Sequence, residues 1–454
     1  MPKSERSAED RPESDFSPRK MIIATACLLG STFVPFVQAT TGPFMMLPMI
    51  KEFGWTRTDY AFASTFFFVC GAITVLVFGR VADRIGVRPI LFAGAIFGGA
   101  TMILLSFQNT ELWRLYGTYA LLGAFGSSGV GYTKVIGSLF TRHRGKALAV
   151  FGAESTVALA ILPILTTTLL AHFGWRGTYI AFGLIMFCVI PIIWLFIPEP
   201  GTKAPGGVRV RPRGATAASP SAPAAALEGM TAAEVRRDRV FWLVVLVGVL
   251  GGGLSQGMQT HMVAAMVDKG FSTGVAGEAI SFATLVGLVG TLAGGFALDH
   301  FRGARIMSVF ALVSALGAVL FALVSASLGG LPLLTLALAL YLGAANATVR
   351  PGGTYLQTRF FGLRAFGEAQ AIQVVFSGIG MAATPPLFGM IFDRFGSYVP
   401  VYWIVVGGTL IAAGIYLVLG PYRYGTGGPP PGAEQAGSSG VGRAEALSSA
   451  PAPS

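Results

Sequence analysis

The sequence is poor in charged residues and in cysteine. Only 12% of its 454 residues are charged, against the roughly 25% that a water-soluble protein carries. With so few charges the chain cannot cover its surface with groups that water solvates, so much of that surface must face lipid. The three cysteines, Cys27, Cys70 and Cys188, lie singly in apolar stretches, which excludes a disulfide framework or a Cys/His metal site. The GxxxxGK[ST] loop that binds ATP phosphates is also absent.

Long apolar stretches are what the chain has instead. Hydrophobic residues make up 53% of it, and the mean hydropathy is +0.66. A helix that crosses a bilayer needs about 20 mostly apolar residues. Twelve stretches meet this requirement: 21–50, 59–79, 89–107, 113–138, 146–170, 177–197, 240–264, 275–298, 305–327, 332–357, 368–391 and 399–420. The sequence therefore predicts an all-α membrane protein with twelve transmembrane helices in two six-helix bundles.

Three segments lie outside these bundles. Pro, Ala, Gly and Arg dominate most of residues 201–239, and residues 423–454 have a similar composition, which cannot bury a core. We therefore expect a cytoplasmic N-terminal tail (1–20), an N-terminal bundle (21–200), a cytoplasmic linker (201–239), a C-terminal bundle (240–422) and a disordered C-terminal tail (423–454).

The basic residues are distributed unevenly between the two sides of the predicted helices. The formal net charge is +11. With a cytoplasmic N-terminus, 24 Lys and Arg residues fall in cytoplasmic segments and only six on the opposite side. The positive-inside rule then predicts a multi-pass protein of the cell (inner) membrane with both termini cytoplasmic. This distribution does not indicate nucleic-acid binding.

The two halves of the chain repeat each other. The matching pairs are Gly79 with Gly295, Asp83 with Asp299, Gln38 with Gln256, Gly145 with Gly367 and Pro163 with Pro385, at offsets of 216 to 222 residues. Each pair alone is weak, but all five occur in the same order in both halves. Such a repeat predicts that the two bundles are pseudo-symmetric.

Several loops resemble those of a known family. Residues 79–88, GRVADRIGVR, are similar to the GxxxDRxGxR signature between helices 2 and 3 of Major Facilitator Superfamily transporters. Residues 52–57, 140–147 and 173–177 further resemble the monocarboxylate and oxalate/formate transporter group. The resemblance implies a secondary active transporter, not an enzyme, that moves a small organic carboxylate by alternating access with proton symport. Unlike that group, the eighth predicted helix carries no charged residue between 279 and 298.

Three ionisable residues lie inside predicted helices, where a charge is costly: Lys134, Glu154 and Arg350. Lys134 and Arg350 are 216 residues apart and so occupy equivalent places in helices 4 and 10. Two cations near the midplane could hold an anion between the bundles, with Arg350 offering a bidentate contact. Glu154 is expected to exchange the coupling proton as a partner of Lys134. Alternatively, Lys134 extends to the interface, Arg350 binds backbone carbonyls, and Glu154 forms only a structural pair.

Other polar residues inside the helices either line a wet cavity or link helices. The further candidates for the substrate site are Gln38, Gln256, Gln259, Asn346 and Gln373. The candidates for a gate are Asp83, Arg84 and Arg88 in the loop motif, with Asp299 and Arg305 in its degenerate second copy. His261 is expected to be structural. We expect no catalytic residues, cofactor or metal, and a monomer whose partners are lipid, a small organic anion and protons.

The main alternative is a proton-driven exporter of drugs or metabolites. Such exporters usually carry a Gly-Pro motif in helix 5, whereas Pro163 has no adjacent glycine. A site for cationic drugs would also favour acidic residues over Lys134 and Arg350. A membrane sensor on the same scaffold is a third possibility, although no soluble signalling domain is recognisable in the sequence.

Overall fold

The computed structural model of the protein describes residues 17–140, 151, 154–197, 229–301, 303–328 and 330–424. Side chains at 291, 292, 295, 298, 299 and 346–354, within two of the helices, are not part of that description. Most of the predicted tails and linker, and the start of the fifth predicted span, therefore lie outside the described residues.

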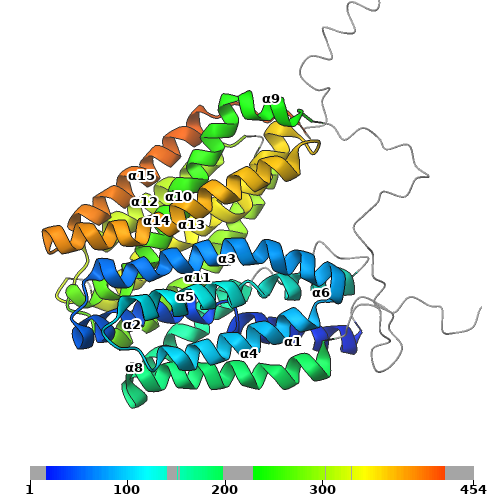
Figure 1. The fold of residues 1–454 in the computed structure, drawn as a ribbon. Helices are drawn as coiled ribbons and strands as arrows, with labels where there is room; N and C mark the ends of the chain where they lie inside the picture. The colour runs from blue at the N-terminus through cyan, green and yellow to red at the C-terminus, as the bar shows by residue number, and fades with distance from the viewer. Residues whose placement is uncertain are drawn as a thin grey trace, which may run out of the picture.

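The described helices form two groups, one from each half of the chain (Figure 1). The first bundle contains α1 (Pro18–Phe33), α2 (Val37–Phe53), α3 (Arg57–Ile85), α4 (Arg88–Leu105), α5 (Leu112–Gly126), α6 (Gly129–Leu139) and α8 (Glu154–Phe196). The second contains α10 (Arg239–Asp268), α11 (Thr273–His300), α12 (Ile306–Leu323), α13 (Gly330–Phe361), α14 (Phe366–Phe395) and α15 (Val399–Val418), preceded by the short α9 (Ala232–Arg237).

The predicted number of membrane crossings is confirmed when α8 is counted as two crossings. In the described part of the chain, nine segments are long and apolar enough to cross a membrane. One of them, α8, has 43 residues, and a straight helix of that length would extend about 65 Å, twice the thickness of the hydrocarbon core. The chain turns instead at Gly174 (φ 64°, ψ −177°), a conformation that essentially only glycine adopts. Two crossings in α8, one in α5–α6 and one in α13 complete the predicted twelve.

Two crossings predicted as continuous helices are broken in the middle. Pro35 has no backbone N–H and separates α1 from α2, while Ser127 and Ser128 separate α5 from α6. The two breaks face each other, because a Cβ on Gly129 would lie 3.2 Å from Cγ of Pro35 and one on Gly126 3.8 Å from its carbonyl oxygen. Irregular backbone at this depth is tolerated in membrane proteins where it is buried or lines a cavity.

Residues near the predicted limits of the linker and the C-terminal tail contact the second bundle. Residues 232–237 within the predicted linker form α9, which begins with a capping box between Thr231 and Glu234. At the other limit, the backbone N–H of Arg423 donates to the carbonyl of Arg359 (3.0 Å). The guanidinium of Arg423 also pairs with Asp238. These contacts attach the end of the second bundle to its beginning.

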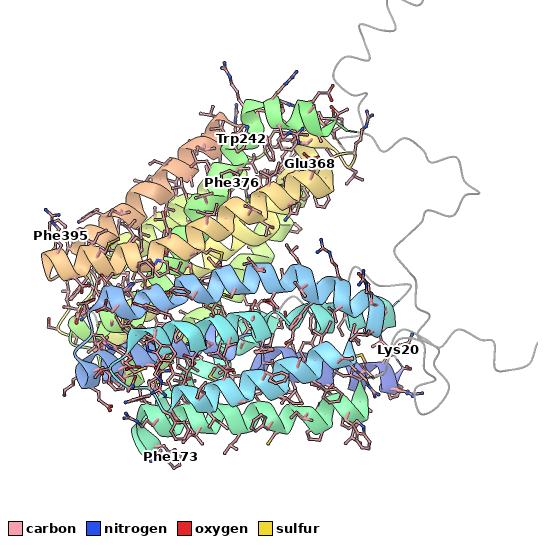
Figure 2. The ribbon with its side chains drawn as sticks, viewed as in Figure 1. Lys20, Phe173, Trp242, Glu368, Phe376 and Phe395 are labelled. Atoms are coloured by element: carbon pink, nitrogen blue, oxygen red, sulfur yellow. The ribbon has the colours of Figure 1, made fainter. Side chains whose placement is uncertain are left out.

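The two bundles approach each other at one end and diverge toward the other (Figure 1). We call the end where α1 and α10 begin the linker end, and the end where α2 finishes and α3 begins the far end. Lys20 and Glu368 lie at the linker end, and Phe173 and Phe395 at the far end (Figure 2). Across the bundles, α3 packs on α14, α8 on α11 and α2 on α10.

The far-end contact between α3 and α14 is close enough to require glycine. A Cβ on Gly389 would lie 2.7 Å from Cα of Thr58, which is closer than real Cβ contacts come. Nearer the middle, the hydroxyl of Thr65 on α3 donates to the carbonyl of Ala382 on α14 at 2.7 Å. The backbones of the two bundles are therefore in direct contact over the far half of these helices.

Candidate functional site

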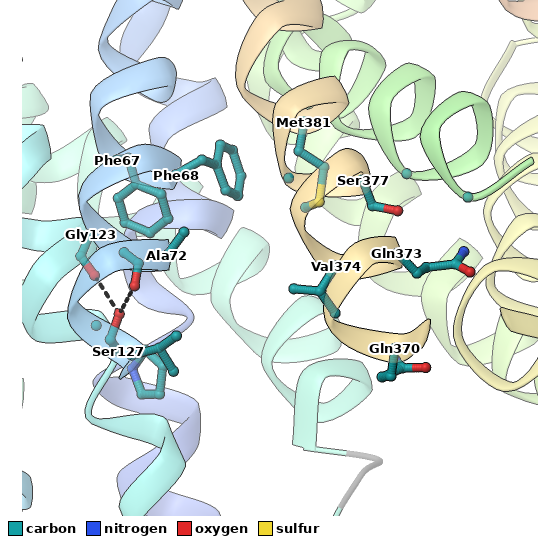
Figure 3. Close-up of a pocket in the computed structure, with 17 residues that line it drawn as sticks. Phe67, Phe68, Ala72, Gly123, Ser127, Gln370, Gln373, Val374, Ser377 and Met381 are labelled. Atoms are coloured by element: carbon teal, nitrogen blue, oxygen red, sulfur yellow. Dashed lines mark hydrogen bonds between the residues drawn. The ribbon is translucent and has the colours of Figure 1, made fainter. Parts of the chain in front are cut away.

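A cleft of about 510 Å³ lies between the bundles. It is lined by α3 and α5 of the first bundle, by α10 and α14 of the second, and by Pro35 at the break between α1 and α2 (Figure 3). Gln370 and Gln373 stand in the first two turns of α14, while Met381 stands near its middle. The cleft therefore extends from the linker end, where the bundles diverge, to the centre of the protein.

The polar groups of the cleft are few and uncharged. They are Ser127, Gln370, Gln373 and Ser377, and the described lining includes no ionisable side chain. The hydroxyl of Ser127 is shared between the carbonyls of Gly71 (2.8 Å) and Gly123 (3.0 Å), which fixes the break after α5 to α3 (Figure 3). Gln373, a predicted site residue, does line the cleft. The other three were missed, because a serine or glutamine in an apolar helix is a weak signal.

Gln373 is held by its neighbours within the second bundle. Its amide oxygen accepts a hydrogen bond from Nε2 of Gln357 (2.7 Å), and its Nε2 donates to the carbonyl of Val244 (3.4 Å). One turn earlier, the buried Oε1 of Gln370 has no hydrogen-bond partner among the described groups. Gln370 is therefore better placed than Gln373 to bind a solute in the cleft.

A second cavity of about 30 Å³, which we call the small cavity, adjoins the cleft. Gln38 and Gln256, which occupy matching positions in the repeat, both line it. Its other lining residues are Ala39, Gly42, Pro43, Tyr60, Ser64, Phe67, Phe68, Tyr119 and Thr260. Phe67 and Phe68 also line the cleft, so these two rings form the boundary between the two spaces.

Lys134 forms an ion pair that the sequence did not predict. Its ammonium donates to Asp83 Oδ1 (2.9 Å) and to the carbonyl of Gly79 (2.8 Å), near the linker end of α3. The partner of Lys134 on α3 is thus the aspartate of the loop motif, and pairing with Glu154 stays a prediction. Glu154 begins the described part of α8 and acts electrostatically on Cys27 and Tyr132 inside the first bundle. Its role in proton exchange stays a prediction.

The remaining gate candidates have different surroundings. Arg88 donates from Nε to the carbonyl of Ile197 (2.6 Å) and from Nη2 to that of Trp194 (3.0 Å), so it binds the carbonyl end of α8. Arg84 is exposed at the end of α3. Arg305 stands at the start of α12, where its carbonyl accepts from Ser308. Arg88 therefore connects two helices of the same bundle in this conformation.

Three predicted residues have side chains outside the described part of the structure. Asn346 and Arg350 lie in α13, and Asp299 lies in α11. Their roles stay predictions. The last substrate-site candidate, Gln259, is half-buried and lines neither the cleft nor the small cavity.

His261 has the environment of a structural histidine. It is completely buried, and its Nε2 lies 2.8 Å from the carbonyl of Pro385, which can only accept. Nε2 therefore carries the proton, and Nδ1 accepts from the hydroxyl of Tyr398 at 2.7 Å. Burial raises the pKa of that hydroxyl, which keeps Tyr398 neutral as a donor.

Ionic contacts join the bundles at the far end. Both guanidinium nitrogens of Arg57 donate to Asp268, at 2.6 and 2.8 Å, while its planar group lies 3.6 Å from the ring centre of Phe392. The carboxylate of Asp393 accepts from the backbone N–H groups of Arg57 (3.2 Å) and Thr58 (2.9 Å), so it caps the positive end of α3. We call Arg57, Asp268 and Asp393 the far-end latch.

The far-end latch was missed because its residues appear in the sequence only as scattered loop charges.

A second far-end ion pair lies within one bundle. Arg176 contacts Glu52 at 2.6 Å, and Nε1 of Trp175 donates to the same carboxylate at 2.7 Å. Both partners belong to the first bundle, so this pair does not join the two halves.

Helical bundles related by a repeat, with broken helices and a cleft between them, define a membrane transporter. The profile of the Major Facilitator Superfamily matches residues 27–340. The chain belongs to this superfamily, and it is a multi-pass membrane protein.

Individual relatives agree with this assignment. An uncharacterized MFS-type transporter, YcxA, of Bacillus subtilis is 29% identical over 157 residues, which cover 34% of this chain and only 38% of that protein. Monocarboxylate transporter 11 of Homo sapiens is 26% identical over 391 residues, 82% of this chain and 76% of that protein. A crystal structure of a D-xylose–proton symporter has the same fold, with a TM-score of 0.68, 16% identity, and coverage of 89% of this chain and 98% of that one.

Proposed function

We propose that this transporter moves a small organic carboxylate across the cell (inner) membrane by alternating access, in symport with protons. The observation that carries the proposal is the one-sided cleft, which is accessible at the linker end and closed at the far end by the far-end latch. A solute that enters from one side can leave on the other only when the two bundles change their relative position.

The choice of a carboxylate draws on the relatives and on Arg350. The match to a monocarboxylate transporter covers most of both chains. Lys134 is occupied by Asp83, so Arg350 is the proposed residue that attracts the anion toward the cleft. Glu154 is the proposed protein group for proton exchange.

The proposed orientation has the linker end and both termini in the cytoplasm, in accord with the excess of basic residues there. The structure then represents an inward-open conformation. In it, Asp83 binds Lys134 within its own bundle. We propose that Asp83, with Arg84, closes the cytoplasmic side after the bundles have moved, while the far-end latch separates.

Export of drugs or metabolites remains the second candidate. The observation in its favour is the described lining of the cleft, which is uncharged and largely apolar, with Phe67, Phe68 and Met381 among its members. Such a surface suits an apolar drug as well as the apolar part of an acid.

Uptake by proteoliposomes distinguishes the carboxylate symporter from the exporter. Purified protein is reconstituted and supplied with ¹⁴C-labelled acetate, pyruvate or benzoate, with and without an inwardly directed proton gradient. At least one acid should accumulate, and the gradient should increase its rate. No uptake of any acid, together with proton-driven transport of a lipophilic cation such as ethidium, would favour the exporter.

A further inference from the structure

The amide of Gln38 is buried without a described hydrogen-bond partner. The residue is only 5% exposed, and neither Nε2 nor Oε1 is bonded to another described group. The hydroxyls of Tyr119 and Tyr179 lie close to the amide and interact with it, but neither forms a well-aligned hydrogen bond with Nε2 or Oε1. Buried polar groups are nearly always paired, and an unpaired one costs about 1–3 kcal/mol. A donor and an acceptor are thus both available toward the small cavity.

The shape of the cavity suits a small polar group. Its volume of about 30 Å³ corresponds to about two water molecules, since one occupies roughly 10–15 Å³ on this measure. A carboxyl group places two oxygens in a similar space. Gly42 keeps the space open, because a Cβ there would lie 3.2 Å from Nε2 of Gln38 and 3.6 Å from the Tyr119 hydroxyl.

The protonation state of the carboxyl group decides whether it fits. A protonated carboxyl has one O–H donor and one carbonyl acceptor, which match the Oε1 acceptor and Nε2–H donor of a primary amide in a ring of two hydrogen bonds. A carboxylate has only acceptors, so it would leave Oε1 of Gln38 unpaired against a negative oxygen. The lining of the cavity also offers no charged side chain to compensate a buried anion.

We propose that Gln38 recognises the carboxyl group of the substrate in its protonated, uncharged form, so that the substrate itself carries the coupling proton. This rests on the proposed transport of carboxylates. The anion takes up one proton from water on the side of entry, and the neutral acid binds in the cavity with its apolar part against Phe67 and Phe68. After the bundles have moved, the acid returns the proton to water on the other side. In this scheme the substrate takes the place of Glu154 as the carrier of the coupling proton.

Two matched series of probes test the proposal on the purified full chain by isothermal titration calorimetry. Each contains an acid, its neutral primary amide and an anionic sulfonate: benzoate, benzamide and benzenesulfonate, or acetate, acetamide and methanesulfonate. A primary amide presents the same donor and acceptor as a protonated acid, but it does not titrate. Between pH 6 and 8, the apparent Kd of the acid should therefore rise about tenfold per pH unit, whereas that of the amide should stay constant.

Gln38→Leu supplies the decisive comparison. It should weaken binding of the amide and of the protonated acid by about 10- to 100-fold, and leave sulfonate binding unchanged. Gln108→Leu is the matched control, because Gln108 is equally buried in the same bundle but lines neither the cleft nor the cavity. Gly42→Ala, which narrows the cavity and crowds the Gln38 amide with a Cβ at 3.2 Å, should weaken the same two ligands.

The results separate two kinds of failure. Unchanged amide binding in Gln38→Leu, or equal losses for amide and sulfonate, would overturn the recognition of a neutral acid while leaving carboxylate transport intact. If the wild-type protein neither binds nor takes up any of the acids, the proposed function itself is wrong, and this inference falls with it.

Discussion

The contact between Arg57 and Asp268 allows the most quantitative prediction. Two unit charges about 4 Å apart attract each other by about 4 kcal/mol at an effective dielectric constant of 20. Much of this is offset by desolvation and by water around Asp268, whose side chain is 36% exposed, against 10% for Arg57. Stacking on Phe392 at 3.6 Å contributes about 1 kcal/mol. We therefore assign about 2 kcal/mol to the far-end contacts of the Arg57 side chain.

Arg57→Ala should shift the equilibrium toward conformations that are open at the far end. A loss of about 2 kcal/mol changes an equilibrium constant about 30-fold, since 1.4 kcal/mol corresponds to a factor of ten. Asp268→Asn should act in the same direction but less, because it keeps a hydrogen-bond acceptor and the stacking. The charge-reversed double variant Arg57→Asp, Asp268→Arg should recover part of the loss.

Distances across the far end provide the measurement. Spin labels are attached at Trp113→Cys, in the first turn of α5, and at Phe395→Cys, at the far end of the second bundle (Figure 2). Both positions are exposed, and the background lacks Cys27, Cys70 and Cys188. Double electron–electron resonance should show a larger population of long distances in Arg57→Ala than in the wild type.

Arg176→Ala is the matched control for this measurement. It also removes a far-end arginine from an ion pair, but its partner Glu52 belongs to the same bundle. Its distance distribution should therefore equal that of the wild type. If Arg57→Ala gives the wild-type distribution, or if both variants shift it equally, the far-end latch does not hold the bundles together.

Three further predictions concern the transport cycle. In proteoliposomes, Arg350→Ala should nearly abolish uptake of the labelled acid and Arg350→Lys should reduce it, because only the guanidinium binds a carboxylate with two parallel bonds; near-normal uptake by Arg350→Ala would exclude this role. Glu154→Gln should keep the tenfold change in apparent Kd per pH unit if the substrate carries the proton, and a flattened pH profile would assign that proton to Glu154. Asp83→Asn should slow turnover and increase cysteine labelling from the linker end with little change in affinity, and labelling equal to the wild type would contradict a gating role.

The architecture could be predicted because its physical cause is local. Each crossing needs about 20 apolar residues, and that requirement can be counted along the chain. The repeat also predicted that Gln38 and Gln256 hold equivalent places, and both line the small cavity. Equivalent positions on the first helix of each bundle face the same central axis, so their proximity follows from the pseudo-symmetry.

Contacts between distant segments could not be predicted in the same way. Lys134 pairs with Asp83 because α3 and α6 present these residues to each other, and hydropathy gives no information about which faces meet. Asp268 and Arg57 are 211 residues apart and lie at helix ends. Charged residues are common there because helix ends lie outside the hydrocarbon core, so their presence does not predict a partner. Pro35 by itself indicates a break in the helix, because proline lacks a backbone N–H. Its contact with Gly129, however, depends on how two helices pack.

A substitution at Gly389 offers a way to obtain the conformation that is open at the far end without changing any charge. Since a single added carbon would lie 2.7 Å from the backbone of Thr58, even alanine at this position acts as a wedge between α3 and α14. A valine would be a larger one. A protein wedged in this way exposes the other side of its binding site, which makes it a practical reagent for selecting conformation-specific antibody fragments and for finding inhibitors that enter from the far end.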